Sequence, residues 1–310
     1  MRTLFLVAVA IFMLSVSSEA QVKLQEGFET SDSTHLPLGW RTWNETGFPP
    51  YDSLALWTVQ DTGLTIPGIG AVLRTVAHSG AKAIRVSWVA GVRADSSYLV
   101  ADDWLISRRI NDIVQNDTLR FWAAGGNGPL NPFFPDTLEI WLGEGDSLPS
   151  SQTLLLDVIT WQSGSLYGVF RKYTYSLQDA AGLNIFVGFR YHTDVSFDGF
   201  CVYVDDIQVA GPLTDVQAPN GLPRDISLSQ NYPNPFNPST TIMWAVPVAS
   251  RVTLKIFNVL GQEIGTLVNG EMGPGEYSTA WDASRFPTGA YFYRLQVGGS
   301  VQTRKLVLVK

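Results

Sequence analysis

The sequence predicts an all-β protein made of two β-sandwiches in series. Apolar and polar residues alternate in short runs, for example over residues 119–123, 138–142 and 185–191, and Gly, Pro, Asn and Asp separate the runs. No long helical period appears, and one short helix is expected near residues 176–182. Once the leader described next is set aside, about 290 residues remain, a length that favours two domains over one.

The first 20 residues have the features of a signal peptide. Arg2 supplies the positive start, residues 4–16 are almost uniformly apolar, and Ser18 and Ala20 are small residues suited to cleavage before Gln21. The apolar run is shorter than the roughly 20 residues that a membrane-spanning helix needs. We therefore expect the protein to be exported.

Charge and cysteine content narrow the class of protein. Residues 21–218 carry 12 basic and 22 acidic residues, a balance of −10, whereas residues 219–310 carry 8 and 5, a balance of +3. An acidic first domain argues against nucleic-acid binding, which needs a basic face, and is compatible with calcium. The single cysteine, Cys201, stands among apolar residues and is expected to be buried and inert.

The chain changes character between the two predicted domains. Residues 212–227 are rich in proline and turn-forming residues, which interrupt strands, and are predicted to be a linker between domains at 21–211 and 228–310. Short strands then resume, and the Gly298-Gly299 pair predicts a hairpin turn between the last two. About 80 residues with this many short strands predict an immunoglobulin-like sandwich.

The C-terminal segment contains a series of motifs, which are NYPNPFNPSTTI at 231–242, LKIFNVLGQE at 254–263, PGEY at 274–277, WDA at 281–283, PTGAYFYRL at 287–295 and KLVLVK at 305–310. With these motifs, roughly residues 228–310 resemble the type A C-terminal sorting domain of the type IX secretion system. It implies a transport signal without chemistry of its own, with the secretion machinery as partner. It also implies a secreted or outer-surface protein, whose C-terminal domain is either cleaved or kept as an anchor.

The N-terminal segment contains a series of short motifs, which are EGFE at 26–29, LPLGW at 36–40, SGAKA at 79–83, DWLIS at 103–107, DTLRFW at 117–122, DTLEI at 136–140, VGFR at 187–190 and VDDI at 204–207. With these motifs, residues 24–210 are similar to cleaved-adhesin or choice-of-anchor J domains, which are jelly-roll sandwiches. MAM domains, which are also jelly rolls, are the nearest competing family. The similarity implies an adhesin-like binding domain, with a glycan or an extracellular protein as ligand.

Four acidic residues form a candidate metal site. The first and last strands of a jelly roll can lie side by side, which would bring Glu26 and Glu29 next to Asp205 and Asp206. Carboxylates that share a small volume need neutralisation, and calcium prefers such oxygen ligands. The apolar face also switches across the Asp pair, which predicts a β-bulge there. The alternative is that the acids are solvated or cap turns.

Aromatic residues in proline-rich segments form a candidate ligand site. These residues, all expected in loops at the rim of the sandwich, are Trp43, Phe48, Tyr51, Phe133 and Phe134. Such rings can stack on sugars or fill a protein pocket. The alternative is that they fold inward and cover the core. Trp104, Trp122 and Trp141 lie in predicted strands, and we expect them to be packing residues.

Catalytic motifs are missing from the sequence, and we predict a protein that is not an enzyme. The three histidines have no metal-ligand spacing, and no nucleophile elbow or phosphate loop appears. A secreted glycan hydrolase remains an alternative, since Asp102-Asp103 or Glu139 with Glu144 could supply paired carboxylates. A structural component of a surface layer is the other alternative.

Overall fold

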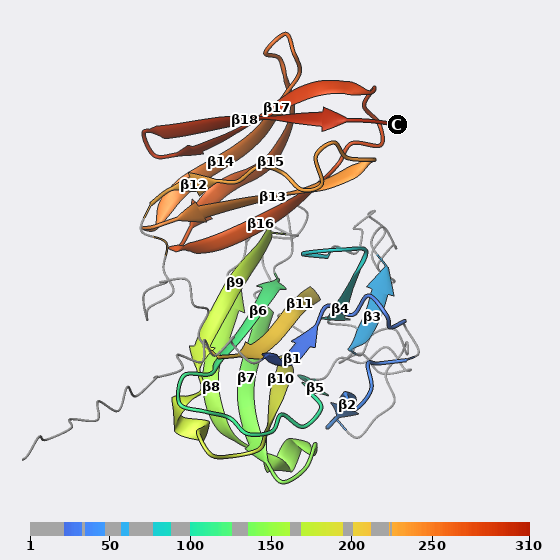
Figure 1. The fold of residues 1–310 in the computed structure, drawn as a ribbon, viewed down its shortest axis with the longest axis vertical. Helices are drawn as coiled ribbons and strands as arrows, with labels where there is room; N and C mark the ends of the chain where they lie inside the picture. The colour runs from blue at the N-terminus through green and yellow to red at the C-terminus, as the bar shows by residue number, and fades with distance from the viewer. Residues whose placement is uncertain are drawn as a thin grey trace, which may run out of the picture.

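The computed structural model has an all-β architecture, as the sequence predicts (Figure 1). The structure describes residues 22–32, 35–46, 57–61, 77–87, 100–125, 136–161, 169–194, 201–211, 223 and 225–310. Within these ranges the only helices are two 3-10 turns, Pro149–Ser151 and Gln178–Ala180, and the second lies in the predicted segment. No helix in this part of the chain has the length and apolarity to cross a membrane. The predicted signal peptide and most of the predicted linker lie outside the described residues.

The N-terminal sandwich consists of two packed antiparallel sheets. The first contains β9 (Val169–Ser176), β6 (Thr118–Ala124), β11 (Cys201–Ala210), β4 (Lys82–Ser87) and β3 (Thr58–Asp61) in that order, with β1 (Val22–Glu26) paired to β11. The second has the order β2 (Arg41–Asn44), β5 (Val100–Ile106), β10 (Ile185–Asp194), β7 (Asp136–Glu144) and β8 (Gln152–Trp161).

The strands alternate as the sequence predicts, and this alternation defines two faces of the second sheet. Leu138, Ile140 and Leu142 of β7 are buried in the core between the sheets, whereas Glu139 and Trp141 point to the opposite side. We call this opposite side, which faces away from the core, the outer face of the second sheet. Tight packing between the sheets fixes the register of each strand, because a shift by one residue would exchange the two faces.

The C-terminal sandwich has its own core. One layer is formed by β12 (Ser227–Leu228), β13 (Ser239–Val246) and β16 (Gly275–Asp282), and the other by β15 (Glu263–Met272), β14 (Ser250–Phe257), β17 (Gly289–Val297) and β18 (Ser300–Leu308). Trp244, Leu254 and Tyr293 lie at its centre. The Tyr293 hydroxyl donates to the Ser229 carbonyl at 2.7 Å, which ties the lead-in segment to this core.

The two sandwiches share one sheet. Strand β16 of the C-terminal sandwich pairs antiparallel with β9 of the N-terminal one, so that a continuous sheet runs from β12 through β16 and β9 to β3 (Figure 1). The proline-rich segment predicted as a linker is therefore not the only connection between them.

Candidate ligand-binding face and carboxylate cluster

A β-bulge in β11 places the Asp205-Asp206 pair. Strand β1 lies antiparallel to β11, with Glu26 opposite Ile207, as expected for the first and last strands. The register between β11 and β6 shifts between Asp205 and Gln208, and Asp206 has a φ of +47°. The predicted bulge is thus confirmed, and its extra residue directs two successive carboxylates toward residues 77–81.

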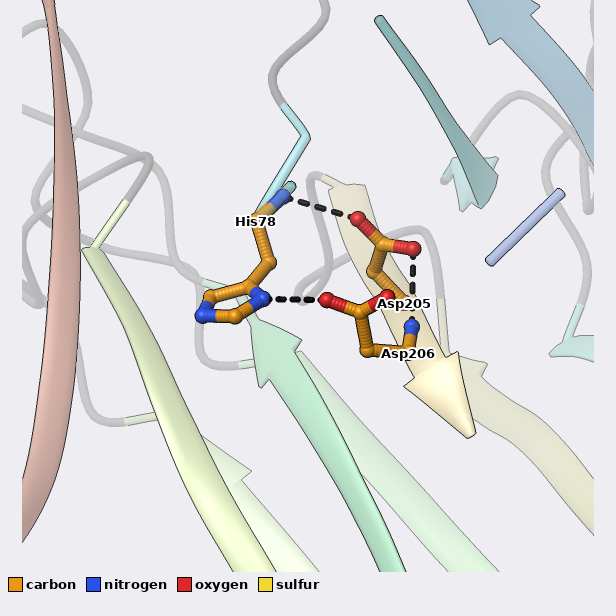
Figure 2. Close-up of side chains that lie close together, drawn as sticks. All are labelled: His78, Asp205 and Asp206. Atoms are coloured by element: carbon orange, nitrogen blue, oxygen red, sulfur yellow. Dashed lines mark hydrogen bonds and ion pairs between the residues drawn. The ribbon is translucent and has the colours of Figure 1, made fainter. Parts of the chain in front are cut away.

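Asp205 is a buried carboxylate held by backbone donors (Figure 2). Its Oδ2 accepts hydrogen bonds from the amides of His78 at 2.9 Å and Ser79 at 3.2 Å, and its Oδ1 accepts one from the amide of Asp206 at 2.7 Å. Burial raises the pKa of Asp205 well above its ordinary value, and the charge of Asp206 adds to the rise. The cluster therefore contains a carboxyl group whose ionised form is costly.

Asp206 completes the cluster with the His78 ring (Figure 2). Asp206 Oδ2 lies 2.5 Å from His78 Nδ1, and Oδ1 accepts a hydrogen bond from the Ser79 hydroxyl at 3.0 Å. Burial opposes ionisation, but these two bonds outweigh it and lower the pKa of Asp206. The imidazole stacks on Trp122 at 3.9 Å, and its Nε2 has no hydrogen-bond partner among the described residues.

The structure brings together two of the four predicted metal ligands. Glu29 accepts hydrogen bonds from the amides of Ala81 and Lys82, and Glu26 accepts one from the Phe28 amide at 2.7 Å. Among the described residues, one set of three or more acidic, His or Cys side chains has its ligand atoms within 4.8 Å of one another, and it consists of His78, Asp205 and Asp206. Glu26 and Glu29 do not belong to that group.

The cluster offers the type of ligand that calcium prefers, but fewer ligands than calcium takes. Asp205 and Asp206 offer hard oxygens, but calcium takes six to eight of them, and every oxygen of this pair already accepts a hydrogen bond or contacts His78. His78 offers nitrogen, which suits transition metals better. Nothing in the sequence singles out His78, which is 127 residues away from Asp205 and far from the other histidines.

The predicted loop aromatics are placed only in part. Trp43 lies on β2 opposite Trp104, so its predicted position in a loop is wrong. It is half-buried, and its indole N–H donates to the Ser147 carbonyl at 2.7 Å. The neighbouring strand β5 pairs along all of β2 and draws this segment into the sheet. Phe48, Tyr51, Phe133 and Phe134 lie outside the described residues.

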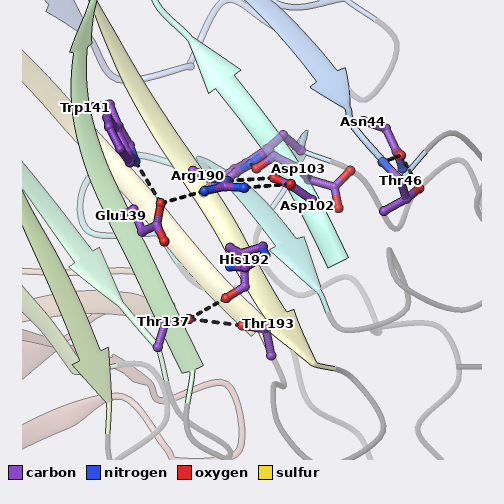
Figure 3. Close-up of polar contacts among 11 residues, drawn as sticks. Asn44, Thr46, Asp102, Asp103, Thr137, Glu139, Trp141, Arg190, His192 and Thr193 are labelled. Carbon is purple, nitrogen blue, oxygen red and sulfur yellow. Dashed lines mark hydrogen bonds and ion pairs between the residues drawn. The ribbon is translucent and has the colours of Figure 1, made fainter. Parts of the chain in front are cut away.

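The outer face of the second sheet carries a charged network centred on Arg190 (Figure 3). The guanidinium donates two hydrogen bonds to Asp102, each 2.7 Å long, and one to Glu139 Oε2 at 3.1 Å. The Trp141 indole donates to the same Glu139 oxygen at 2.8 Å. The Arg190, Asp102 and Glu139 side chains remain 22%, 19% and 17% exposed. We call Asp102, Glu139, Trp141 and Arg190 the Arg190 network.

Tryptophan and glutamine side chains lie beneath and beside this network. The Arg190 guanidinium lies 5.1 Å from the centroid of the buried Trp104 ring, and the Trp104 and Trp141 rings are 5.9 Å apart. The Gln152 side chain crosses Gly188 and Gly143, where an added Cβ would meet it at 3.1 and 2.4 Å. Within the described part of the chain, the buried Gln152 Oε1 accepts no hydrogen bond.

Asp102 and Asp103, one of the two acid pairs of the hydrolase alternative, lie on opposite faces of β5. Asp102 belongs to the Arg190 network on the outer face, whereas the neighbouring Asp103 is buried and points to the other side of β5. Successive strand residues face opposite ways, so these two carboxyl groups cannot flank one substrate bond. Trp104 and Trp122 are buried, as expected for packing residues, and Trp141 is half-buried.

Comparisons with known proteins identify the family of the C-terminal segment. Residues 230–310 match the model of the secretion system C-terminal sorting domain. No curated protein matches the chain. Solved structures similar to the chain include the K3 and K1 cleaved adhesin domains of Lys-gingipain from Porphyromonas gingivalis. Their identities are 17% and 18%, they cover 63% and 61% of this chain and 100% and 98% of those chains, and both TM-scores are 0.43.

A third solved structure, the tandem CBM22 domains of Xyn10C from Paenibacillus barcinonensis, is 12% identical. It covers 93% of this chain and 98% of that chain, with a TM-score of 0.34. The sorting-domain match agrees with the segment that the sequence motifs mark, including the NYPNPF opening and the closing KLVLVK strand. Residues 230–310 are therefore a type IX secretion C-terminal sorting domain, and the protein is exported to the cell surface or the extracellular space.

Proposed function

We propose that this is a non-enzymatic binding protein of the cell surface, and that its N-terminal sandwich takes a hydroxyl-rich ligand, such as a glycan, on the outer face of the second sheet. The observation that carries the proposal is the Arg190 network over Trp104. A guanidinium and two carboxylates can donate to and accept from neighbouring hydroxyl groups, and the half-buried Trp141 ring offers apolar surface to sugar C–H groups.

The network suits binding because its side chains are ordered before the ligand arrives. Arg190 holds both carboxylates, Trp141 fixes Glu139, and all three charged side chains keep part of their surface open. Groups fixed in this way lose little conformational freedom on binding. The predicted loop aromatics Phe48, Tyr51, Phe133 and Phe134 would add stacking rings at the rim, and an extracellular protein is the second ligand class.

The test is a glycan and extracellular-protein array probed with the full mature chain and with Arg190→Ala and Arg190→Lys. Loss of charged hydrogen bonds worth about 1.5–3 kcal/mol should weaken binding about 10- to 100-fold. Arg294→Ala is the matched control, because Arg294 also lies over an aromatic ring, that of Phe257 at 4.7 Å, but in the sorting domain. Equal binding by wild type and both Arg190 variants would exclude this face as the ligand site.

We also propose that a calcium ion stabilises the end of the first and last strands, with Asp205 and Asp206 as its ligands and with oxygens recruited from Glu26 and Glu29. The proposal is supported by the two adjacent carboxylates and by the raised pKa of the buried Asp205. The ion would supply positive charge to two carboxylates whose oxygens now accept hydrogen bonds from backbone amides or contact the His78 ring. Since the Asp206–His78 contact occupies one oxygen, we expect that contact to open when the ion binds.

Thermal unfolding with calcium and with EDTA tests this second proposal. Calcium at about 100 times its dissociation constant would add about 2.7 kcal/mol of stability. Asp206→Asn should abolish the difference between the two conditions, whereas Glu271→Gln, an exposed acid on β15, should keep it. A wild-type melting temperature that calcium leaves unchanged would rule the ion out.

A further inference from the structure

The joint between the two sandwiches is a short strand pairing with a defined register. Val169, Phe170 and Arg171 of β9 lie opposite Thr279, Ser278 and Tyr277 of β16. Val169 is 6% exposed and packs in the hydrophobic core of the C-terminal sandwich, although its strand belongs to the N-terminal one. The strand therefore contributes both backbone hydrogen bonds and a side chain to the neighbouring domain.

Two basic side chains of β9 extend the contact beyond the paired residues. Arg171 Nη2 donates to the Pro274 carbonyl at 2.7 Å, and Lys172 forms an ion pair with Glu276 at 2.9 Å. Gly275 leaves room for the arginine, because a Cβ at this position would lie 2.9 Å from Arg171 Nε. Gly275 thus makes space for the Arg171 side chain, and Glu276 supplies the carboxylate that pairs with Lys172.

An unpaired strand edge is a ready site for another strand. One edge of β16 pairs with β13, so the opposite edge would be open in a sorting domain standing alone. In this chain β9 covers that edge, and β16 in turn covers the edge of β9 that β6 leaves free.

We propose that the edge of β16 opposite β13 is a strand-acceptor surface of the sorting domain, and that β9 of the same chain occupies it. The order apolar, apolar, Arg, Lys over residues 169–172 selects this strand and its register. A slip by one residue would take Val169 out of the C-terminal core and move Arg171 away from Gly275. This inference does not depend on the proposed ligand. It concerns how the sorting domain is attached to the N-terminal sandwich.

Cross-linking across the joint tests the occupant and the register together. Continuing the register from Tyr277–Arg171 places Lys172 opposite Glu276, close enough for a disulfide between antiparallel strands. In the full chain, Lys172→Cys with Glu276→Cys should oxidise to an internal cross-link in a monomer. Lys172→Cys with Asp282→Cys, at the far end of β16, should not. Cys201 is buried and does not compete.

The double variant Lys172→Cys with Glu276→Cys also distinguishes pairing within one chain from pairing between two chains. A disulfide that forms only between molecules, with a yield that rises with protein concentration, would show that a second copy supplies β9 and would overturn the proposal. Failure of the 172–276 pair to close, in protein with the wild-type melting temperature, would overturn it as well, because the strands would not be side by side in solution.

Exchanging the charges of Lys172 and Glu276 tests whether this ion pair helps to select β9 as the strand that pairs with β16. Lys172→Glu and Glu276→Lys each place like charges side by side, and hydrogen exchange at the amides of residues 169–171 and 277–279 should become about three- to tenfold faster. The double exchange restores opposite charges and should restore slow exchange. Rapid exchange of both segments in the wild type, or equal exchange in all four proteins, would contradict the assignment of β9 as occupant.

Discussion

Asp103 is a buried acid on the core side of β5. The residue is 1% exposed, and within the described structure neither carboxyl oxygen accepts a hydrogen bond. Burial raises its pKa to about 8, the neighbouring charge of Asp102 adds to the rise, and the Asn44 amide opposes it. At neutral pH the folded protein therefore keeps this acid largely protonated, whereas the unfolded chain releases the proton near pH 4.

This difference predicts that stability falls as pH rises from about 4 to 8, because the folded state binds the extra proton throughout that window. Asp103→Asn keeps the shape and removes the titration, so it should stabilise the protein at pH 8 by several kcal/mol, since each pKa unit corresponds to about 1.4 kcal/mol. Urea unfolding of both proteins at pH 5 and pH 8 measures the effect. Parallel losses of stability in wild type and variant would show that another group is responsible.

The sequence points to some of these residues and misses others for physical reasons. Asp205 and Asp206 stand out because the apolar face switches at the pair, which is a local signal. His78 joins them only through the fold, and Arg190 gives no local sign of the two carboxylates on neighbouring strands that it binds. The pairing partners of a strand residue depend on long-range register, which one sequence does not reveal.

At the scale of elements, two glycines of β7 and β10 make the outer face possible. An added Cβ at Gly143 would lie 2.4 Å from the Ser151 carbonyl oxygen and from the Gln152 side chain, and backbone cannot yield as a flexible side chain can. The Gln152 side chain lies across this space, beside the tryptophans. The β7–β8 connection and the outer face therefore depend on the absence of a side chain at Gly143.

Gly143→Ala should destabilise the N-terminal sandwich by about 1–3 kcal/mol, the usual cost of overpacking. Gly289→Ala on β17 is the matched control, because nothing lies within 4 Å of its added Cβ, and its effect should stay within about 0.5 kcal/mol. Differential scanning calorimetry compares them. Equal melting temperatures for the two variants would mean that the β7–β8 connection relaxes without cost.

The sequence predicts which segments form strands better than it predicts where those strands lie in the sheets. The alternation of Leu138, Ile140 and Leu142 with polar or aromatic neighbours identifies β7, and Gly298 and Gly299 form the predicted turn between β17 and β18, with Gly298 at a φ of +54°. Trp43 was assigned to a loop because proline and glycine surround its segment. Pairing with β5 overrides that local preference, as tertiary contacts often do in sheets.

At the scale of the whole molecule, the two cores are coupled through β9 and β16. The proline-rich segment suggested independent domains, and it gave no sign that Val169 enters the C-terminal core. Removal of residues 225–310 would expose Val169 and leave the amides of its segment without β16. Burial of a valine is worth about 1.5–3 kcal/mol, so the N-terminal sandwich should melt several degrees lower in the shortened chain.

Calorimetry of the full chain and of a chain ending at residue 224 makes this comparison. Val169→Ala in the full chain is the finer probe, since it should lower the stability of the C-terminal sandwich while its own backbone pairing remains. If truncation leaves the melting temperature of the N-terminal sandwich unchanged, the two domains are energetically independent despite their common sheet.

The shared sheet also determines how the protein responds to mechanical load. A ligand held by the N-terminal sandwich and a sorting domain held at the cell surface would pull on the molecule from its two ends. The joint has three register pairs, whereas β13 and β16 share eight, so the joint is expected to open first. The pairing of β9 with β16 would therefore be the contact that yields to tension before the strands within either sandwich separate.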